Sequence, residues 1–322
     1  MESNETTGRA WPKDFPPIAV LAHTWEMQEH AEYKAAKAGD REAAAKLVID
    51  ITRNTTQQNT LKQLAEKHPD TIVAPVHAEE MEGRNQIPSL LSDYFGSITG
   101  LEVDNNIVQA TRSGRTDSGA WGRMALRPTF DGSVQSGRKY IIIDDVVTQG
   151  GTLSEMRRYI EANGGEVVQM LTIGAARNSI IIALSEKNKR KLERQFGVEK
   201  LQNFLKEVGL YGGNYEALTA SEARQLMEAG TLDEARNRIL EARQAGDSEI
   251  REEMVSGTRS ETNSLEENAT GNEKNTPGRP ERGGPVFEDG SRLAPASTGA
   301  RSLYPALNLI LHRIISIIMC IL

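Results

Sequence analysis

Residues 140–153 read YIIIDDVVTQGGTL, and this stretch carries the strongest structural signal in the chain. Its apolar residues predict a buried strand, which ends in the adjacent carboxylates Asp144 and Asp145. A short loop with two glycines follows, and a helix is expected immediately after it. A strand, a loop and a helix in this order are typical of an α/β domain, in which ligands bind at the carboxyl ends of the strands.

The loop after this strand has the composition of an anion-binding site. Its members are Thr148, Gln149, Gly150, Gly151 and Thr152. The glycines permit positive φ and close backbone approach, so several N–H groups can converge on one anion at a helix N-terminus, where the helix dipole adds to the attraction. The threonine hydroxyls add donors, while the two preceding carboxylates accept hydrogen bonds and suit the hydroxyls of a ribose. The segment therefore predicts a sugar-phosphate site.

Other interpretations of the segment fit less well. It lacks the lysine of a Walker A loop and the G-x-G-x-x-G spacing of a dinucleotide-binding fold. The remaining alternative is an ordinary strand–turn–helix without a ligand. Two carboxylates at the end of a buried strand are a costly way to build a turn, so the binding site is the better interpretation.

Alternating strand and helix patterns surround this segment from Asp70 onward. They predict an open, mainly parallel five-stranded sheet flanked by helices. Its strands are expected near Thr71–His77, Asn106–Thr111, Met124–Phe130, Tyr140–Asp144 and Glu166–Ile173. One further short strand is expected at Ile18–His23.

The composition divides the chain into four segments. An N-terminal helical extension over 1–67 precedes the α/β core over 68–185, and a charged helical region follows over 186–250. The tail over 251–322 is rich in Gly, Pro, Ser, Asn, Glu and Arg, so we predict disorder there. Its apolar end has charge at its centre, which is costly in a membrane, so a membrane partner is not the expectation. A tail anchor, a docking helix and an altered terminus stay open as interpretations of that end.

The overall charge and the cysteine content narrow the function classes. A net charge of −7 argues against a general nucleic-acid binder, which needs a basic face to displace counterions from phosphates. Cys320 is the single cysteine and cannot form an internal disulfide, as is usual in a reducing compartment. Residues 1–9 are polar and acidic, without the apolar run of a signal peptide. We therefore expect a cytoplasmic protein that is not a general nucleic-acid binder.

The segment 140–153 resembles the signature of the type I phosphoribosyltransferases, with an apolar strand, an acidic pair, two further apolar residues and a Thr/Gly loop. With the surrounding strands, the resemblance covers roughly residues 70–180. It implies that Asp144 and Asp145 contact the ribose 2′ and 3′ hydroxyls and that the loop over 148–152 holds the 5′-phosphate. It also implies a Mg²⁺ cofactor that is held mainly by oxygens of the ligand.

Members of this family grip pyrophosphate with the loop after the first core strand, which corresponds to residues 75–85 here. The resemblance makes His77, Arg84 and Asn85 the candidates for this role. Arg84 and Asn85 stand just before a helix start marked by proline, where they can donate to an anion. For His77, a structural histidine at the end of a strand is the alternative.

Residues 112–127, RSGRTDSGAWGRMALR, resemble the mobile lid of the family because they are rich in Gly, Ser and Arg. Such a lid would exclude water and place a guanidinium on the leaving pyrophosphate. Arg115 and Arg123 are the catalytic candidates within it. A solvated surface loop is the alternative, and the lid lysine of the orotate enzymes has no counterpart in this stretch.

The resemblance implies transfer of a 5-phosphoribosyl group from 5-phosphoribosyl 1-pyrophosphate to a nitrogen nucleophile such as a nucleobase, with release of pyrophosphate. Thr148 stands where the 6-oxopurine enzymes carry an aspartate, which argues against hypoxanthine or guanine; the base itself is not assigned. A ligand-sensing regulator of the same fold is one alternative, and an interaction protein with a vestigial core is another. A homodimer is the default expectation for such a protein.

Overall fold

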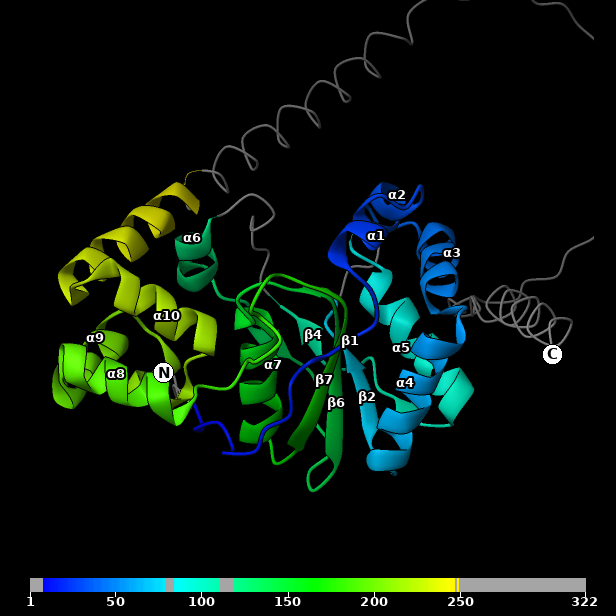
Figure 1. Cartoon of the computed structure of the whole chain (residues 1–322), viewed down its shortest axis with the longest axis horizontal. Coiled ribbons are helices and arrows are strands. Elements are labelled where there is room, and N and C mark those ends of the chain that lie inside the picture. Colours follow the sequence, from blue (N-terminus) through cyan, green and yellow to red (C-terminus); the bar gives the residue numbers. More distant parts are fainter. Residues whose placement is uncertain (1–7, 79–83, 111–118, 247, 249–322) are drawn as a thin grey trace, which may run out of the picture. The chain divides into compact units, whose positions relative to one another are not determined.

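In the computed structural model of the chain, the centre of the fold is a parallel sheet of five strands in the order β1-β7-β6-β2-β3 (Figure 1). The strands are β1 (Ala19–Val20), β2 (Ile72–Pro75), β3 (Glu102–Val103), β6 (Lys139–Val147) and β7 (Glu166–Ala175). β6 lies in the middle, and its residues 140–143 are completely buried. Because helices cover both faces of the sheet, this strand is a continuous apolar run rather than an alternation. The predicted five-stranded α/β fold is confirmed.

Two hydrophobic cores lie on opposite faces of the sheet, because successive residues of a strand point to opposite sides. Ile141 and Ile143 of β6 pack against five helices on one face, and Tyr140 and Ile142 pack against α7 (Gly151–Ala162) on the other. The five helices are α1 (Thr24–Gln28), α2 (Tyr33–Lys37), α3 (Arg41–Thr52), α4 (Thr55–Lys67) and α5 (Ile87–Thr99). The N-terminal extension therefore supplies much of one face of the core.

A third hydrophobic core joins the C-terminal helices to α6 (Ala120–Ala125). Its helical members are α8 (Glu186–Phe196), α9 (Val198–Glu207) and α10 (Ala220–Ala229), with the 3₁₀ turns η1 (Tyr211–Gly213) and η2 (Tyr215–Ala217). Residues 232–246 are also helical. Met124 and Ala125 are buried among these helices, so α6 is held by the C-terminal region.

The strand expected over Met124–Phe130 is wrong. This stretch divides between the end of α6 and β5 (Phe130–Asp131), which pairs antiparallel with β4 (Val108–Gln109) in a separate two-stranded sheet. The beginning of the stretch faces the C-terminal helices, and alternation along the chain does not reveal such a long-range contact. The strand expected over Asn106–Thr111 corresponds to β4. The central sheet therefore contains β1 and β3 instead of β4 and β5.

The structure describes residues 8–78, 84–110, 119–246 and 248, all within a compact unit that spans Met1–Leu265. The tail expected over 251–322, with its apolar end, lies outside the described residues. Among the described helices, none has both the length and the apolar character that crossing a membrane requires.

Candidate functional site

Asp144 and Asp145 are neighbours on β6 and therefore point to opposite faces of the sheet. Asp145 contacts Lys37 of α2, whereas Asp144 lines a cavity together with the loop that follows β6. The two carboxylates thus have different surroundings: Asp145 is ion-paired within the protein, and Asp144 lines a cavity.

Three donors hold Asp145. Lys37 Nζ donates to its Oδ2 at 2.8 Å, and Asn85 Nδ2 donates to the same oxygen at 3.0 Å. The backbone N–H of Val146 donates to Oδ1 at 2.8 Å. Burial lowers the pKa of Lys37, but the ion pair with Asp145 outweighs burial and raises this pKa above its ordinary 10.5. Lys37 is therefore charged at neutral pH. Through this lysine the N-terminal extension contacts the acidic pair.

Asp144 lines a cavity of ≈130 Å³ with Arg123 and the loop over residues 146–153. The backbone N–H of Asp145 donates to Asp144 Oδ1 at 2.8 Å. Burial raises the pKa of Asp144 well above its usual 3.8, and the neighbouring charge of Asp145 raises it further. Hydrogen-bond donors or a cation that enter the cavity would stabilise the ionised form of Asp144 and lower its pKa again.

Gly150 fixes the shape of the loop at the start of α7. It is the N-cap of this helix and adopts a left-handed conformation, with φ of +78°. A Cβ at this position would lie 2.7 Å from Cδ1 of Ile182, so a larger residue would collide as well as be strained. Because α7 begins directly at the cavity, its first N–H groups and its dipole favour an anion there.

The C-terminal helices hold the loop from another side. Thr219 Oγ1 donates to the carbonyl oxygen of Gln149 at 2.8 Å, and the side-chain amides of Gln149 and Gln225 are hydrogen-bonded to one another. Neither contact is predicted from the sequence. The capping box at 219–222 does indicate the start of a helix, but no local pattern indicates that this helix lies against a loop 70 positions earlier.

Arg127 lies in a buried ion-pair network. Its guanidinium contacts Glu155 of α7 at 2.8 Å, contacts Glu222 of α10, and stands 4.3 Å from the ring centre of Tyr211. The lid expected over residues 112–127 is therefore wrong at its C-terminal end. Two buried carboxylates need a compensating cation, so this arginine joins α7 to α10 rather than moving with a lid.

Arg123 lies on α6, four residues before Arg127, and lines the cavity. The next residue, Met124, is fully buried in the third core, so the backbone beside the cavity is anchored. Arg115, the second candidate cation, lies outside the described residues. The catalytic roles of both arginines stay predictions.

The three expected pyrophosphate-binding residues occupy different surroundings. Asn85 reaches Asp145, as described above. The carbonyl oxygen of Arg84 accepts a hydrogen bond from the side chain of Gln86 at 3.2 Å. His77 follows β2, and burial lowers the pKa of its ring below the ordinary 6.5, so the ring is mainly neutral at pH 7. The roles of these residues stay predictions as well.

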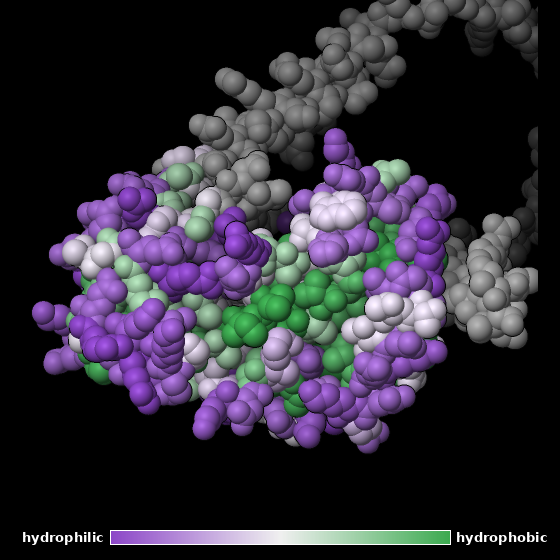
Figure 2. Space-filling model, in the orientation of Figure 1, coloured by the Kyte–Doolittle hydropathy of each residue, from purple (hydrophilic) through white to green (hydrophobic). Residues whose placement is uncertain are grey.

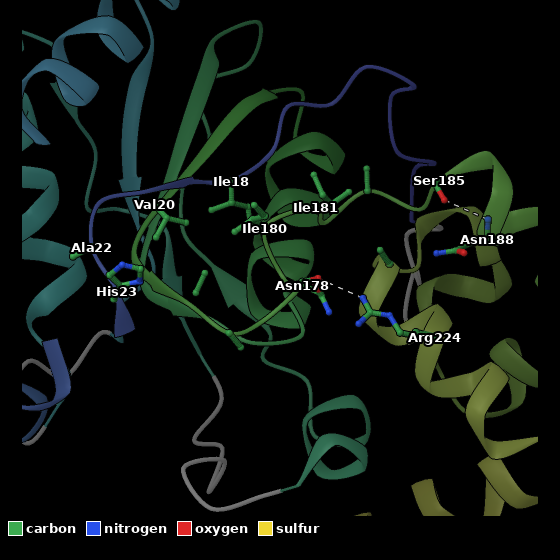
Figure 3. A pocket seen from close by; sticks show the side chains of 14 residues that line it. Ile18, Val20, Ala22, His23, Asn178, Ile180, Ile181, Ser185, Asn188 and Arg224 are labelled. Atoms are coloured by element: carbon green, nitrogen blue, oxygen red, sulfur yellow. Dashed lines mark hydrogen bonds between the residues drawn. The ribbon is translucent and has the colours of Figure 1, made fainter. Parts of the chain in front are cut away.

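A larger hollow of ≈940 Å³ lies beside β1 and the segment that follows β7 (Figure 3). Ile180 and Ile181 line it and are 41% and 51% exposed, and Figure 2 shows apolar side chains gathered across the middle of this face of the molecule. No carboxylate of the described residues lines this hollow. It therefore lacks the chemistry of a sugar-phosphate site, and the smaller cavity at Asp144 is the candidate.

Comparison with known proteins gives partial matches. No family model matches the chain. The chain is 35% identical to protein TraN of Escherichia coli over 243 residues, which are 76% of this chain and 53% of TraN, so it spans about half the length of that protein. It is 29% identical over 140 residues to the adenine phosphoribosyltransferase of Thermosipho melanesiensis, which covers 41% of this chain and 67% of that protein. The crystal structure of adenine phosphoribosyltransferase from Leishmania tarentolae aligns with 53% of this chain and 82% of its own, at 17% identity and a TM-score of 0.29.

Proposed function

Because the chain is a distant relative of the type I phosphoribosyltransferases, we propose that it binds 5-phosphoribosyl 1-pyrophosphate and transfers the phosphoribosyl group to a nitrogen nucleophile. One observation carries the proposal: Asp144, the loop over 148–152 and Arg123 line the same cavity, although they come from a strand, a loop and a separate helix. An acceptor for sugar hydroxyls, donors for a phosphate and a cation for a leaving anion thus stand together.

The cavity accounts for the 5′-phosphate. Its volume of ≈130 Å³ is well below the roughly 300–1,000 Å³ of pockets that enclose whole drug-sized ligands, so it suits one small group. The left-handed Gly150 and the start of α7 supply backbone donors and a favourable dipole. The ribose would lie at the edge of this cavity that Asp144 lines, and the rest of the ligand would extend beyond it.

Asp144 accounts for the ribose. An ionised carboxylate is unfavourable in its buried surroundings, which is why its pKa is raised. A ribose hydroxyl is a hydrogen-bond donor, and donation to a carboxylate favours its charged form. We therefore expect binding of the sugar to lower the pKa of Asp144.

The proposed reaction needs positioning and charge stabilisation. The bond between ribose C1 and the pyrophosphate oxygen breaks with both electrons leaving on pyrophosphate, the nitrogen nucleophile forms the new bond to C1, and its proton passes to solvent. Arg123 is the predicted cation for the charge that develops on the leaving group. The protein needs no nucleophile of its own, since the incoming nitrogen supplies the electron pair.

Mg²⁺ fits this donor set as a cation held mainly by the ligand. Mg²⁺ is usually bound by one or two carboxylates plus phosphate oxygens of the ligand. Asp144 is the carboxylate that would contribute. When bound, the ion would neutralise part of the pyrophosphate charge.

A regulator that senses the same ligand without turnover is the alternative. One observation favours it: Asp145 points away from the cavity and is held by Lys37 and Asn85, so Asp144 is the one carboxylate of the pair that lines the cavity. Turnover distinguishes the two functions, since both require binding.

Calorimetric titration of the chain over residues 1–322 with 5-phosphoribosyl 1-pyrophosphate and Mg²⁺ tests the proposal. We expect micromolar affinity, or about −8 kcal/mol, followed by release of pyrophosphate when the accepted nucleobase or amine is added. Binding without pyrophosphate release across a panel of nucleobases would support the sensor. Absence of binding would overturn both functions.

A further inference from the structure

We propose that Lys37 is a ligand-binding residue, which leaves Asp145 when 5-phosphoribosyl 1-pyrophosphate binds and pairs with the diphosphate of that ligand. The inference rests on the proposed function and adds to it a cation from the N-terminal extension. No feature of the sequence motif indicates this residue, because it lies 108 positions before Asp145.

The geometry places a partly exposed cation directly on one carboxylate of the acidic pair. Lys37 Nζ is 2.8 Å from Asp145 Oδ2, and its side chain keeps 35% of its surface exposed. An ammonium group has three donors, and the contact with Asp145 uses one of them. In the ligand, the 2′-hydroxyl and the diphosphate stand on adjacent carbons, so a cation that contacts the carboxylate for a ribose hydroxyl is within a small side-chain movement of the diphosphate.

Asp145 keeps a partner when Lys37 leaves. Asn85 Nδ2 donates to the same oxygen at 3.0 Å, and the backbone of Val146 donates to the other oxygen. A ribose hydroxyl can replace the lysine as the additional donor to Oδ2. The exchange therefore leaves no buried carboxylate without hydrogen bonds, which would otherwise be costly.

The backbone that carries Lys37 is fixed to the loop beside the acidic pair. The N–H of Gln86 donates to the carbonyl oxygen of Ala36 at 3.1 Å, and Arg41 donates to the side chain of Gln86 at 3.1 Å. The end of α2 and the residue after Asn85 are thus joined directly. The lysine can change partners by rotation of its own side chain, without movement of α2.

Two ligands and three variants test the inference in the chain over residues 1–322 with Mg²⁺. Ribose 5-phosphate has the sugar and the 5′-phosphate but lacks the diphosphate. We expect Lys37→Met to weaken 5-phosphoribosyl 1-pyrophosphate at least tenfold and to leave ribose 5-phosphate unchanged or bound more tightly, because the lysine no longer competes for Asp145. Lys37→Arg should restore most of the lost affinity, and Lys34→Met, on an exposed lysine of the same helix, should bind both ligands like the wild type.

The outcomes separate this inference from the function on which it rests. Equal weakening of both ligands by Lys37→Met would mean that the lysine only positions Asp145, and unchanged binding of both would remove it from the site; either result overturns the inference alone. A wild-type chain that binds neither ligand overturns the proposed function and this inference with it. If Lys37→Met does not fold in a thermal melt, the arginine variant decides: tenfold weaker binding of both ligands to a folded Lys37→Arg chain would overturn the inference.

Discussion

The hydroxyl of Thr219 donates a 2.8 Å hydrogen bond to the carbonyl oxygen of Gln149, in the middle of the loop that follows β6. The same hydroxyl oxygen accepts from the backbone N–H of Glu222 at 3.1 Å and caps α10. One side chain therefore sets both the start of a C-terminal helix and the conformation of the candidate phosphate-binding loop.

Replacement of Thr219 by valine tests this coupling. Valine keeps the shape but removes the hydroxyl, so the cap and the bond to the loop are both lost. We expect the free energy of unfolding to fall by about 1–2 kcal/mol and the affinity for ribose 5-phosphate to fall severalfold. Chemical denaturation and calorimetry measure the two effects. Thr219→Ser keeps both hydrogen bonds and is the control; a valine variant that binds like the serine variant would show that the loop does not depend on α10.

Gly150 and Gly137 form a matched pair, because φ is +78° at both. Alanine at either position costs roughly 1–2 kcal/mol for the left-handed conformation. At Gly137 a Cβ has nothing within 4 Å, whereas at Gly150 it would meet Ile182 at 2.7 Å. We therefore expect Gly150→Ala to unfold at lower denaturant concentration than Gly137→Ala and to be the one of the two that loses ribose 5-phosphate binding. Equal losses of stability would show that Ile182 moves aside at no cost.

Asp144→Asn should stabilise the free protein while it weakens ligand binding. The folded-state pKa of Asp144 is raised by burial and by Asp145, with opposition from Lys37. A raised pKa means that the contribution of Asp144 to stability is full below its ordinary 3.8 and is lost as the pH rises through the folded-state pKa. At pH 7 the asparagine variant should therefore melt about 2–4 °C above the wild type, and the difference should disappear near pH 4. Calorimetry should show at least tenfold weaker ribose 5-phosphate binding.

Asp145→Asn should have the opposite effect on stability. Its loss removes the charged partner of Lys37, which costs about 1–2 kcal/mol for a hydrogen bond between charged groups that is partly exposed to solvent. The pair of variants thus tests whether the two carboxylates have different surroundings. Melting temperatures that shift in the same direction at pH 7 would contradict the assignment.

Arg127→Met should be strongly destabilising because it leaves Glu222 buried without its cation and Glu155 with Arg158 alone. The expected loss is about 3–5 kcal/mol, measured by denaturant titration. Arg138→Met is the control: its ion pair with Glu102 is exposed, at 38% and 47% of the two side chains, and its loss should cost less than about 1 kcal/mol. Comparable losses in the two variants would mean that the buried network contributes little.

The same network predicts an acid dependence. Burial raises the pKa of Glu155, but Arg127 and Arg158 outweigh burial and lower it below the ordinary 4.5. A lowered pKa means that the stabilisation is present above pH 4.5 and is lost as the pH falls through the folded-state pKa. Wild-type stability should therefore decrease below pH 4.5. A similar decrease in a folded Arg127→Met chain would exclude this ion pair as its cause.

The sequence by itself determined the parts of this protein whose signals are local. The apolar run before Asp144 requires a buried strand, the glycines after it require a turn, and Thr219 with Glu222 forms a capping box; each pattern involves residues within a few positions of one another. The five-stranded parallel fold followed from the alternation of such elements.

Only the tertiary structure decided what those elements face. Met124, in an expected strand, lies in a helix because the C-terminal core buries it, and Arg127, in an expected lid, is fixed by two carboxylates from α7 and α10. Lys37 reaches Asp145 across 108 positions because the sheet order brings the N-terminal helices to one face of β6. Such contacts depend on which faces of the helices and the sheet pack together, and patterns among neighbouring residues in the sequence do not indicate this packing.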